Sequence, residues 1–170
     1  MVQDTSSFAG HSPPPLAPVA APVVEPARFR ILVTDDDKGS REAIAQLLAA
    51  RGFEIVQANS GEQAIDIVRV KVIHLVVFDM HMPRMTGLEA LEQIRLINSI
   101  LPALLMTADA TRSVIQQALQ AQVYSVLPKP VNTTLLFHAM TRALSQVYGK
   151  MPGQHPQTQQ PPVPPATAPE

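Results

Sequence analysis

The sequence predicts an α/β fold in which a parallel sheet is covered by helices on both faces. Within residues 29–148, short apolar runs alternate with segments whose apolar residues recur every three to four positions, as in buried strands and amphipathic helices. The alternation occurs five times. The run at residues 73–78 is apolar except for His74, which is typical of a central strand covered on both sides. This order predicts an open, doubly wound sheet with right-handed crossovers.

The predicted strands are the apolar runs at residues 29–34, 53–58, 73–78, 101–106 and 124–127. The first helix begins near Ser40 and stops at Gly52, where glycine favours a helix end. Capping boxes predict where the second and third helices begin; the pairs are Ser60 with Gln63 and Thr86 with Glu89.

Apolar stripes define the last two helices. The fourth carries Val114, Ile115, Ala118 and Leu119 at helical spacing. The fifth begins at Asn132 or Thr133, which are suitable capping residues. We expect its buried face to consist of Leu136, Met140, Leu144 and Val147.

Proline marks the boundaries of the folded segment. Of the 17 prolines, six lie within residues 1–28 and seven within residues 149–170, which leaves four for residues 29–148. Both ends are also poor in large apolar side chains, so they cannot bury enough surface to offset chain entropy. We therefore expect one folded domain at 29–148, between a disordered Pro-rich extension at 1–28 and a disordered Pro/Gln-rich tail at 149–170.

Charge and composition exclude several classes of protein. The 170 residues carry a net charge of −1, which offers no electrostatic argument for binding nucleic acid or an anionic membrane. The absence of cysteine excludes disulfides, thiolate nucleophiles and Cys-ligated zinc. No apolar run approaches the ~20 residues of a membrane span, and Pro13–Pro15 interrupt any signal peptide. We expect a soluble, cytoplasmic protein.

Polar side chains follow four of the predicted strands. Asp35, Asp36 and Asp37 come after the first, Asp79 after the third, Thr107 after the fourth, and Lys129 near the end of the fifth. Because ligands of such sheets bind outside the carboxyl ends of the strands, we expect these side chains to converge on one edge.

The chemistry of this set points to phosphoryl transfer. Neighbouring carboxylates disfavour one another's ionisation, and Mg²⁺, which prefers oxygen ligands, relieves that cost. A carboxylate in such a site can attack phosphorus and carry an aspartyl-phosphate. Lys129 would neutralise charge on the phosphoryl group, and Thr107 would donate a hydrogen bond to it.

Five stretches of the chain carry a resemblance to a known family. They are ILVTDDD at 31–37, Arg41, HLVVFDMHMPRMTGLE at 74–89, MTA at 106–108 and LPKP at 127–130. Residues 29–148 thereby resemble the receiver domain of two-component response regulators. The resemblance implies the flavodoxin-like form of the fold, with five strands in the order 2-1-3-4-5 and five helices.

The resemblance also implies a role for each site residue. Asp79 would be the phosphoacceptor, Thr107 the switch hydroxyl and Lys129 the partner of the phosphoryl group. The Lys129–Pro130 peptide bond would be cis. The Mg²⁺ cofactor would be held by Asp35, Asp36, Asp79 and the backbone carbonyl of His81.

Further implications concern partners. The phosphoryl donor would be a histidine kinase or phosphotransfer protein, and the protein would catalyse its own phosphorylation and dephosphorylation. The signal would pass to a downstream protein target, or to a second copy in a homodimer, through the fourth helix, fifth strand and fifth helix. Val126, Leu135 and Phe137 would make this face apolar. Because 22 residues follow Tyr148, we expect a stand-alone receiver, as in chemotaxis.

Two alternatives remain open from the sequence. Asp35 and Asp37 imitate the start of the motif of haloacid-dehalogenase phosphatases, although Gly39 stands where that motif has Thr or Val. A receiver-shaped interaction module that works without phosphate is the second alternative. A flavodoxin is disfavoured because no phosphate-binding loop rich in Ser, Thr and Gly follows the first strand.

Overall fold

A computed structural model of the protein describes residues 29–149. In this part of the chain, five parallel strands form one sheet in the order β2-β1-β3-β4-β5, which confirms the predicted fold class. The strands are β1 (Arg30–Thr34), β2 (Glu54–Ala58), β3 (Leu75–Asp79), β4 (Ala103–Thr107) and β5 (Ser125–Pro128). The disorder predicted for 1–28 and for 149–170 falls, except for Gly149, outside the described residues.

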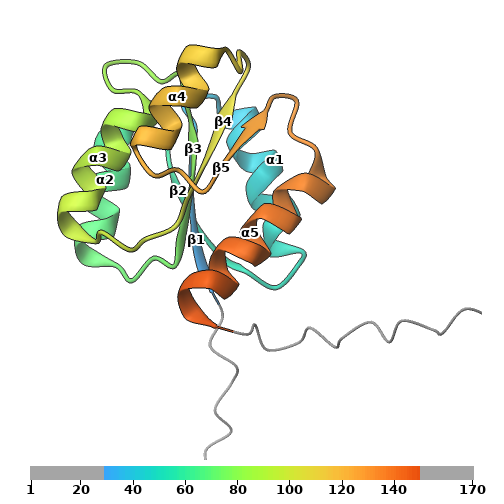
Figure 1. Ribbon diagram of the computed structural model, residues 1–170. Helices are drawn as coiled ribbons and strands as arrows, with labels where there is room; N and C mark the ends of the chain where they lie inside the picture. The colour runs from blue at the N-terminus through green and yellow to red at the C-terminus, as the bar shows by residue number, and fades with distance from the viewer. Residues whose placement is uncertain (1–28, 150–170) are drawn as a thin grey trace, which may run out of the picture.

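Within residues 29–149, five helices cover the two faces of the sheet (Figure 1). One face packs against α1 and α5, and the other against α2, α3 and α4. The helices are α1 (Lys38–Ala49), α2 (Gly61–Val70), α3 (Gly87–Ile97), α4 (Arg112–Gln120) and α5 (Thr133–Tyr148). None of the helices within residues 29–149 combines the length and the hydropathy that a membrane-spanning helix requires.

The strands separate two apolar cores because successive side chains of a strand point to opposite faces. Ile31 and Val33 of β1 belong to the core under α1 and α5, whereas Leu32 belongs to the core under α2, α3 and α4. All five residues of β3 and of β4 are buried. This explains why their sequences are continuous apolar runs rather than alternating ones.

The helix starts follow the predicted caps, with one correction. Thr86 and Glu89 form a complete capping box at α3. Ser60 caps α2 by accepting from the Gln63 N–H, but the Gln63 side chain accepts from Asn59 N–H rather than from Ser60. The Ser60–Gln63 box is therefore only half formed, because the Gln63 amide reaches one residue further back along the chain. Asn132 caps α5.

Each predicted strand begins one or two residues before the observed one, and boundaries next to the site differ as well. Asp79 and Thr107 are the last residues of β3 and β4 rather than the residues after them. Pairing continues that far because Asp79 lies opposite Met106 and the Thr107 carbonyl accepts from Lys129 N–H at 2.7 Å. Helix α1 begins at Lys38, before Ser40, because Asp37 caps it.

Helix α4 is less buried than its apolar spacing predicts. Ala118 is buried and Val114 is half-buried, but Ile115 and Leu119 are 41% and 70% exposed. The helix packs on the sheet through a narrow stripe, so part of its apolar side stays in contact with water.

Candidate functional site

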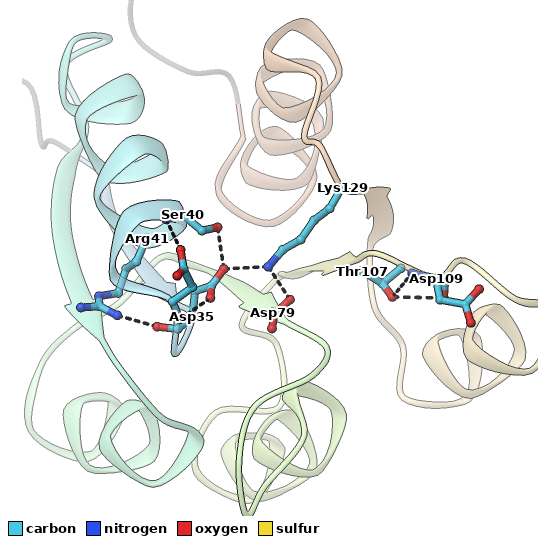
Figure 2. Close-up of polar contacts among 8 residues, drawn as sticks. Asp35, Ser40, Arg41, Asp79, Thr107, Asp109 and Lys129 are labelled. Atoms are coloured by element: carbon cyan, nitrogen blue, oxygen red, sulfur yellow. Dashed lines mark hydrogen bonds and ion pairs between the residues drawn. The ribbon is translucent and has the colours of Figure 1, made fainter.

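The carboxyl ends of β1, β3 and β5 bring three charged side chains together. Asp35 follows β1, Asp79 ends β3, and Lys129 follows β5. The Lys129 ammonium lies between the two carboxylates, with Nζ 2.8 Å from Asp35 Oδ2 and 2.7 Å from Asp79 Oδ1 (Figure 2). Lys129 comes 94 positions after Asp35 and 50 positions after Asp79 in the chain. The three residues thus form one ionic cluster at the edge of the sheet that the sequence predicts.

Burial makes this cluster electrostatically unusual. The side chains of Asp35, Asp79 and Lys129 are 1%, 7% and 24% exposed. Burial raises the pKa of Asp79 above its ordinary value; the negative charges of Asp35 and Asp36 add to that effect, while Lys129 opposes it. For Lys129, burial alone would lower the pKa, but hydrogen bonds to Asp35 and Asp79 outweigh it and the pKa is raised.

Three carboxylates converge on the same point. One oxygen each of Asp35, Asp36 and Asp79 lies within 4.8 Å of the others. Within residues 29–149, Lys129 forms ion pairs with Asp35 and Asp79, and no ion pair is found for Asp36, so one carboxylate of the cluster has no cationic partner there. Clustered carboxylate oxygens are the ligand set that Mg²⁺ prefers, and the residues present therefore fit this ion.

Helix α1 holds Asp35 in place. The Ser40 hydroxyl donates to Asp35 Oδ2 at 2.7 Å, and Arg41 Nη1 donates to the Asp35 carbonyl at 2.6 Å. Asp37 N–H donates to Asp35 Oδ1 at 2.9 Å. The sequence pattern predicts no role for Ser40 in the site; a hydroxyl five residues after the first acid, in the first turn of the next helix, was the signal that could have suggested one.

Gly87 allows the loop after β3 to close tightly. Its N–H donates to the Met80 carbonyl at 3.1 Å, and a β-carbon here would collide with the carbonyl oxygen of Asp79. His81 lies in this loop, two residues after Asp79, and is exposed. An ion pair of 3.3 Å between Arg84 Nε and Glu62 Oε1 fastens this loop to α2.

Thr107 lies at the predicted edge, but its hydroxyl bonds within its own loop. It donates to the Asp109 carbonyl and accepts from Asp109 N–H, both at 3.1 Å (Figure 2). The side chain is buried, and its hydroxyl would have to leave these two bonds before it could bond to a group on Asp79. The predicted cis peptide bond between Lys129 and Pro130 is present.

The three residues predicted for the apolar face have different surroundings. Leu135 is 44% exposed on α5, and Val126 is half-buried against the core under α2, α3 and α4. Phe137 packs against the other core and lies 4.1 Å beneath the Arg51 guanidinium, beside the end of α1. The structure therefore does not bring Phe137 together with Val126, because it occupies the flank of α5 that faces α1.

A family model named for the response regulator receiver domain matches residues 31–141. The chain belongs to this family. The matched residues include Asp35, Asp36, Asp79 and Lys129. The acidic edge of the sheet therefore lies within the receiver domain. The comparisons give no support to a dehalogenase-type phosphatase.

Curated relatives of this receiver are longer proteins. Transcriptional regulatory protein ZraR of Escherichia coli K12 is 34% identical over 118 residues, which cover 69% of this chain and 27% of ZraR. Response regulator MprA of Mycolicibacterium vanbaalenii is 38% identical over 101 residues, covering 59% of this chain and 44% of MprA. The chain thus spans about a quarter of the length of ZraR and less than half of MprA.

Solved receiver structures match along almost their whole length. A CheY-like receiver domain protein from Methanospirillum hungatei JF-1 has a TM-score of 0.68 and 25% identity, covering 71% of this chain and 96% of that one. A receiver protein from Pseudomonas putida has a TM-score of 0.65 and 27% identity, covering 68% and 98%. These likenesses support a role in two-component signalling.

Proposed function

We propose that this receiver accepts a phosphoryl group on Asp79 from a histidine kinase or phosphotransfer protein in a Mg²⁺-dependent reaction. The observation that carries the proposal is the Lys129 ammonium, bound to both Asp35 and Asp79 at 2.8 and 2.7 Å beside a third carboxylate. This arrangement supplies a nucleophile, a fixed positive charge and oxygen ligands at one point.

The transfer is a displacement at phosphorus. A carboxylate oxygen of Asp79 forms the new bond to phosphorus, while the bond from phosphorus to the donor histidine nitrogen breaks and the nitrogen keeps the electron pair. Lys129 lies 2.7 Å from Asp79 Oδ1, close enough to pair with the arriving phosphoryl oxygens. Later attack by water returns Asp79 to a carboxylate and releases inorganic phosphate.

Asp35 and Asp36 would hold Mg²⁺ together with Asp79, and the backbone carbonyl of His81 would be the fourth protein ligand. When bound, the ion supplies positive charge that offsets the repulsion between the phosphoryl group and the acids. Thr107 would leave Asp109 and donate its hydroxyl hydrogen to a phosphoryl oxygen.

The output of the reaction is a changed docking surface. We define the α4–β5–α5 face by Ile115, Leu119, Val126 and Leu135, of which Leu119 is 70% exposed. Rotation of Thr107 would shift the population between two packings of this face. The occupant is a downstream protein target or a second copy of the chain. A cytoplasmic location is also part of this proposal.

Beryllium fluoride tests the proposal, since it imitates a phosphoryl group on a carboxylate. We expect fluorine NMR to show one bound complex per protein when Mg²⁺ is present. The complex should disappear after chelation with EDTA and in an Asp79→Asn variant.

An Asp37→Asn variant serves as the matched control, because Asp37 is a neighbouring acid that caps α1 and is given no role in the reaction. It should bind beryllium fluoride as the parent does. A complex that survives Asp79→Asn but is lost on Asp35→Asn would contradict the proposal and favour the phosphatase alternative.

A further inference from the structure

The carboxylate of Asp35 is held by three donors from the chain itself. Oδ2 accepts from the Ser40 hydroxyl at 2.7 Å and from Lys129 Nζ at 2.8 Å, while Oδ1 accepts from Asp37 N–H at 2.9 Å. The residue is buried, so little water is available at its carboxylate to replace a donor that is removed. Each of the three bonds therefore contributes to the orientation of this carboxylate.

The Ser40 hydroxyl is itself held in place. Ser40 lies in the first turn of α1, where its own N–H donates to Asp37 Oδ1 at 2.6 Å. The next residue, Arg41, donates to the Asp35 carbonyl at 2.6 Å. The first turn of α1 thus donates hydrogen bonds to both the side chain and the backbone carbonyl of Asp35, as Figure 2 shows. The hydroxyl is directed at Oδ2 by a rigid helix rather than by a mobile loop.

Ser40 and Lys129 meet on the same oxygen. Asp35 Oδ2 is where the ammonium that bridges to Asp79 is anchored. If the carboxylate turned about its last side-chain bond, Lys129 would lose this anchor and its position over Asp79. The Ser40 hydroxyl opposes that rotation.

We infer that Ser40 is a positioning residue of this site: its hydroxyl fixes the Asp35 carboxylate so that Lys129 stays aligned with Asp79. The inference rests on the proposed phosphorylation of Asp79 for its effect on rate. Its structural part, the orientation of Lys129 by Ser40 through Asp35, applies to the protein without any phosphodonor. Ser40 touches no reacting atom and acts through Asp35 and Lys129.

The test compares Ser40→Ala and Ser40→Thr in the full chain. Alanine removes the hydroxyl but keeps the backbone N–H that Asp37 caps, and it is a good helix former. Threonine restores a hydroxyl at the same place. Ser113→Ala is the matched control, because Ser113 also lies in the first turn of a helix and is exposed on α4.

The first measurement is the NMR signal of the Lys129 ammonium group without phosphodonor. We expect Ser40→Ala to shift or broaden it, and Ser40→Thr and Ser113→Ala to leave it as in the parent. The second is the rate of phosphorylation by acetyl phosphate at saturating Mg²⁺. Ser40→Ala should lower this rate about tenfold, as expected when an orienting charge-assisted hydrogen bond is lost; saturating Mg²⁺ keeps any weaker binding of the ion by Asp35 out of this comparison.

The outcomes separate this inference from the proposed function. An unchanged Lys129 signal in Ser40→Ala would overturn the inference, whether or not the protein is phosphorylated. A Ser40→Thr variant as slow as Ser40→Ala would overturn it too, because the hydroxyl would not be the cause. If the parent itself takes no phosphoryl group while the Lys129 signal responds to Ser40→Ala, the proposed function fails and the positioning contact stands.

Discussion

At the scale of single residues, the ionised carboxylate of Asp79 is electrostatically unfavourable in the folded protein. Burial raises its pKa above the ordinary value of 3.8, and Asp35 and Asp36 add to this. For an acid with a raised pKa, ionisation lowers stability once the pH rises above the ordinary value. We expect Asp79→Asn to increase the free energy of unfolding at pH 7.5 by about 1 kcal/mol, a rise in Tm of about 4 °C.

Thermal unfolding followed by circular dichroism measures this gain. It should shrink toward zero as the pH falls to 4, because the parent then folds with Asp79 increasingly protonated. Asp66→Asn is the control: Asp66 is 75% exposed on α2, and its substitution should change stability by less than about 0.5 kcal/mol. A less stable Asp79→Asn protein at pH 7.5 would show that the Lys129 pair outweighs burial.

His74 gives a second dependence on pH, at the opposite end of the sheet. Its Nδ1 accepts from Arg30 N–H at 2.9 Å, and its ring lies 5.4 Å from Phe29 and 5.5 Å from Tyr148. Burial, followed by the charge of Arg30, lowers the pKa of His74, while Glu54 opposes this. A histidine whose pKa is lowered in the folded state stabilises the protein at pH values above its ordinary pKa of 6.5. This stabilisation is lost as the pH falls below that value.

We therefore expect the parent to lose more stability between pH 7.5 and pH 5.5 than a His74→Gln variant does. Urea unfolding at several pH values measures the two slopes. His138→Gln serves as the control, since His138 is exposed on α5, and it should retain the slope of the parent. Identical slopes for the parent and His74→Gln would refute this account of His74.

Residue types were easier to predict than side-chain directions. The acids and Lys129 follow from the rule that carboxyl ends of parallel strands share one edge. The bond from Thr107 to Asp109, the hydroxyl of Ser40 on Asp35 and the place of Phe137 under Arg51 do not follow from it. These depend on rotamers that neighbouring elements select, and no spacing in the sequence encodes them.

At the scale of elements, the start of α3 requires glycine, the residue without a β-carbon. Gly87 is the first residue of this helix, where alanine would ordinarily be the better choice by about 1 kcal/mol. A β-carbon would collide with the Asp79 carbonyl, which belongs to a rigid strand. We expect Gly87→Ala to lower the free energy of unfolding by about 1–3 kcal/mol, as measured by urea unfolding.

Gly39→Ala is the matched control in the first turn of α1, where the nearest atom to a new β-carbon is Asp37 Oδ1 at 3.4 Å. It should be neutral or stabilising. If both alanine variants were equally stable, the contact between Gly87 and Asp79 would not be what requires glycine.

Helix α4 and helix α5 together carry the proposed docking face. Leu119 and Leu135 are 70% and 44% exposed, so replacing both with serine should change the free energy of unfolding by less than about 1 kcal/mol. We expect the double variant to weaken self-association of the phosphorylated protein at least tenfold, because apolar contact drives docking. Sedimentation velocity at micromolar concentrations measures this.

The matched control replaces Val70 and Val72 with serine, since these are 79% and 68% exposed outside this face. It should associate as the parent does. A phosphorylated parent that stays monomeric at high micromolar concentration would refute the homodimer, and a downstream target would then be the remaining occupant.

At the scale of the whole molecule, the fold class was predictable because each level of the sequence agrees with it. The continuous apolar runs of β3 and β4 match strands covered on both faces, and Ala118 marks the narrow buried stripe of α4. Exposure of Ile115 and Leu119 was not predictable, because helical spacing alone does not show how wide the buried stripe is. The architecture separates the proposed phosphoryl site at the strand ends from the apolar face through which it would signal.

The most direct test of the central claim is the intact mass of the full chain after incubation with acetyl phosphate. With Mg²⁺ present we expect one added phosphoryl group, which peptide mapping locates on Asp79, and none in the presence of EDTA or in the Asp79→Asn variant. A phosphoryl group located on Asp35, or gained equally by Asp79→Asn and the parent, would contradict the account.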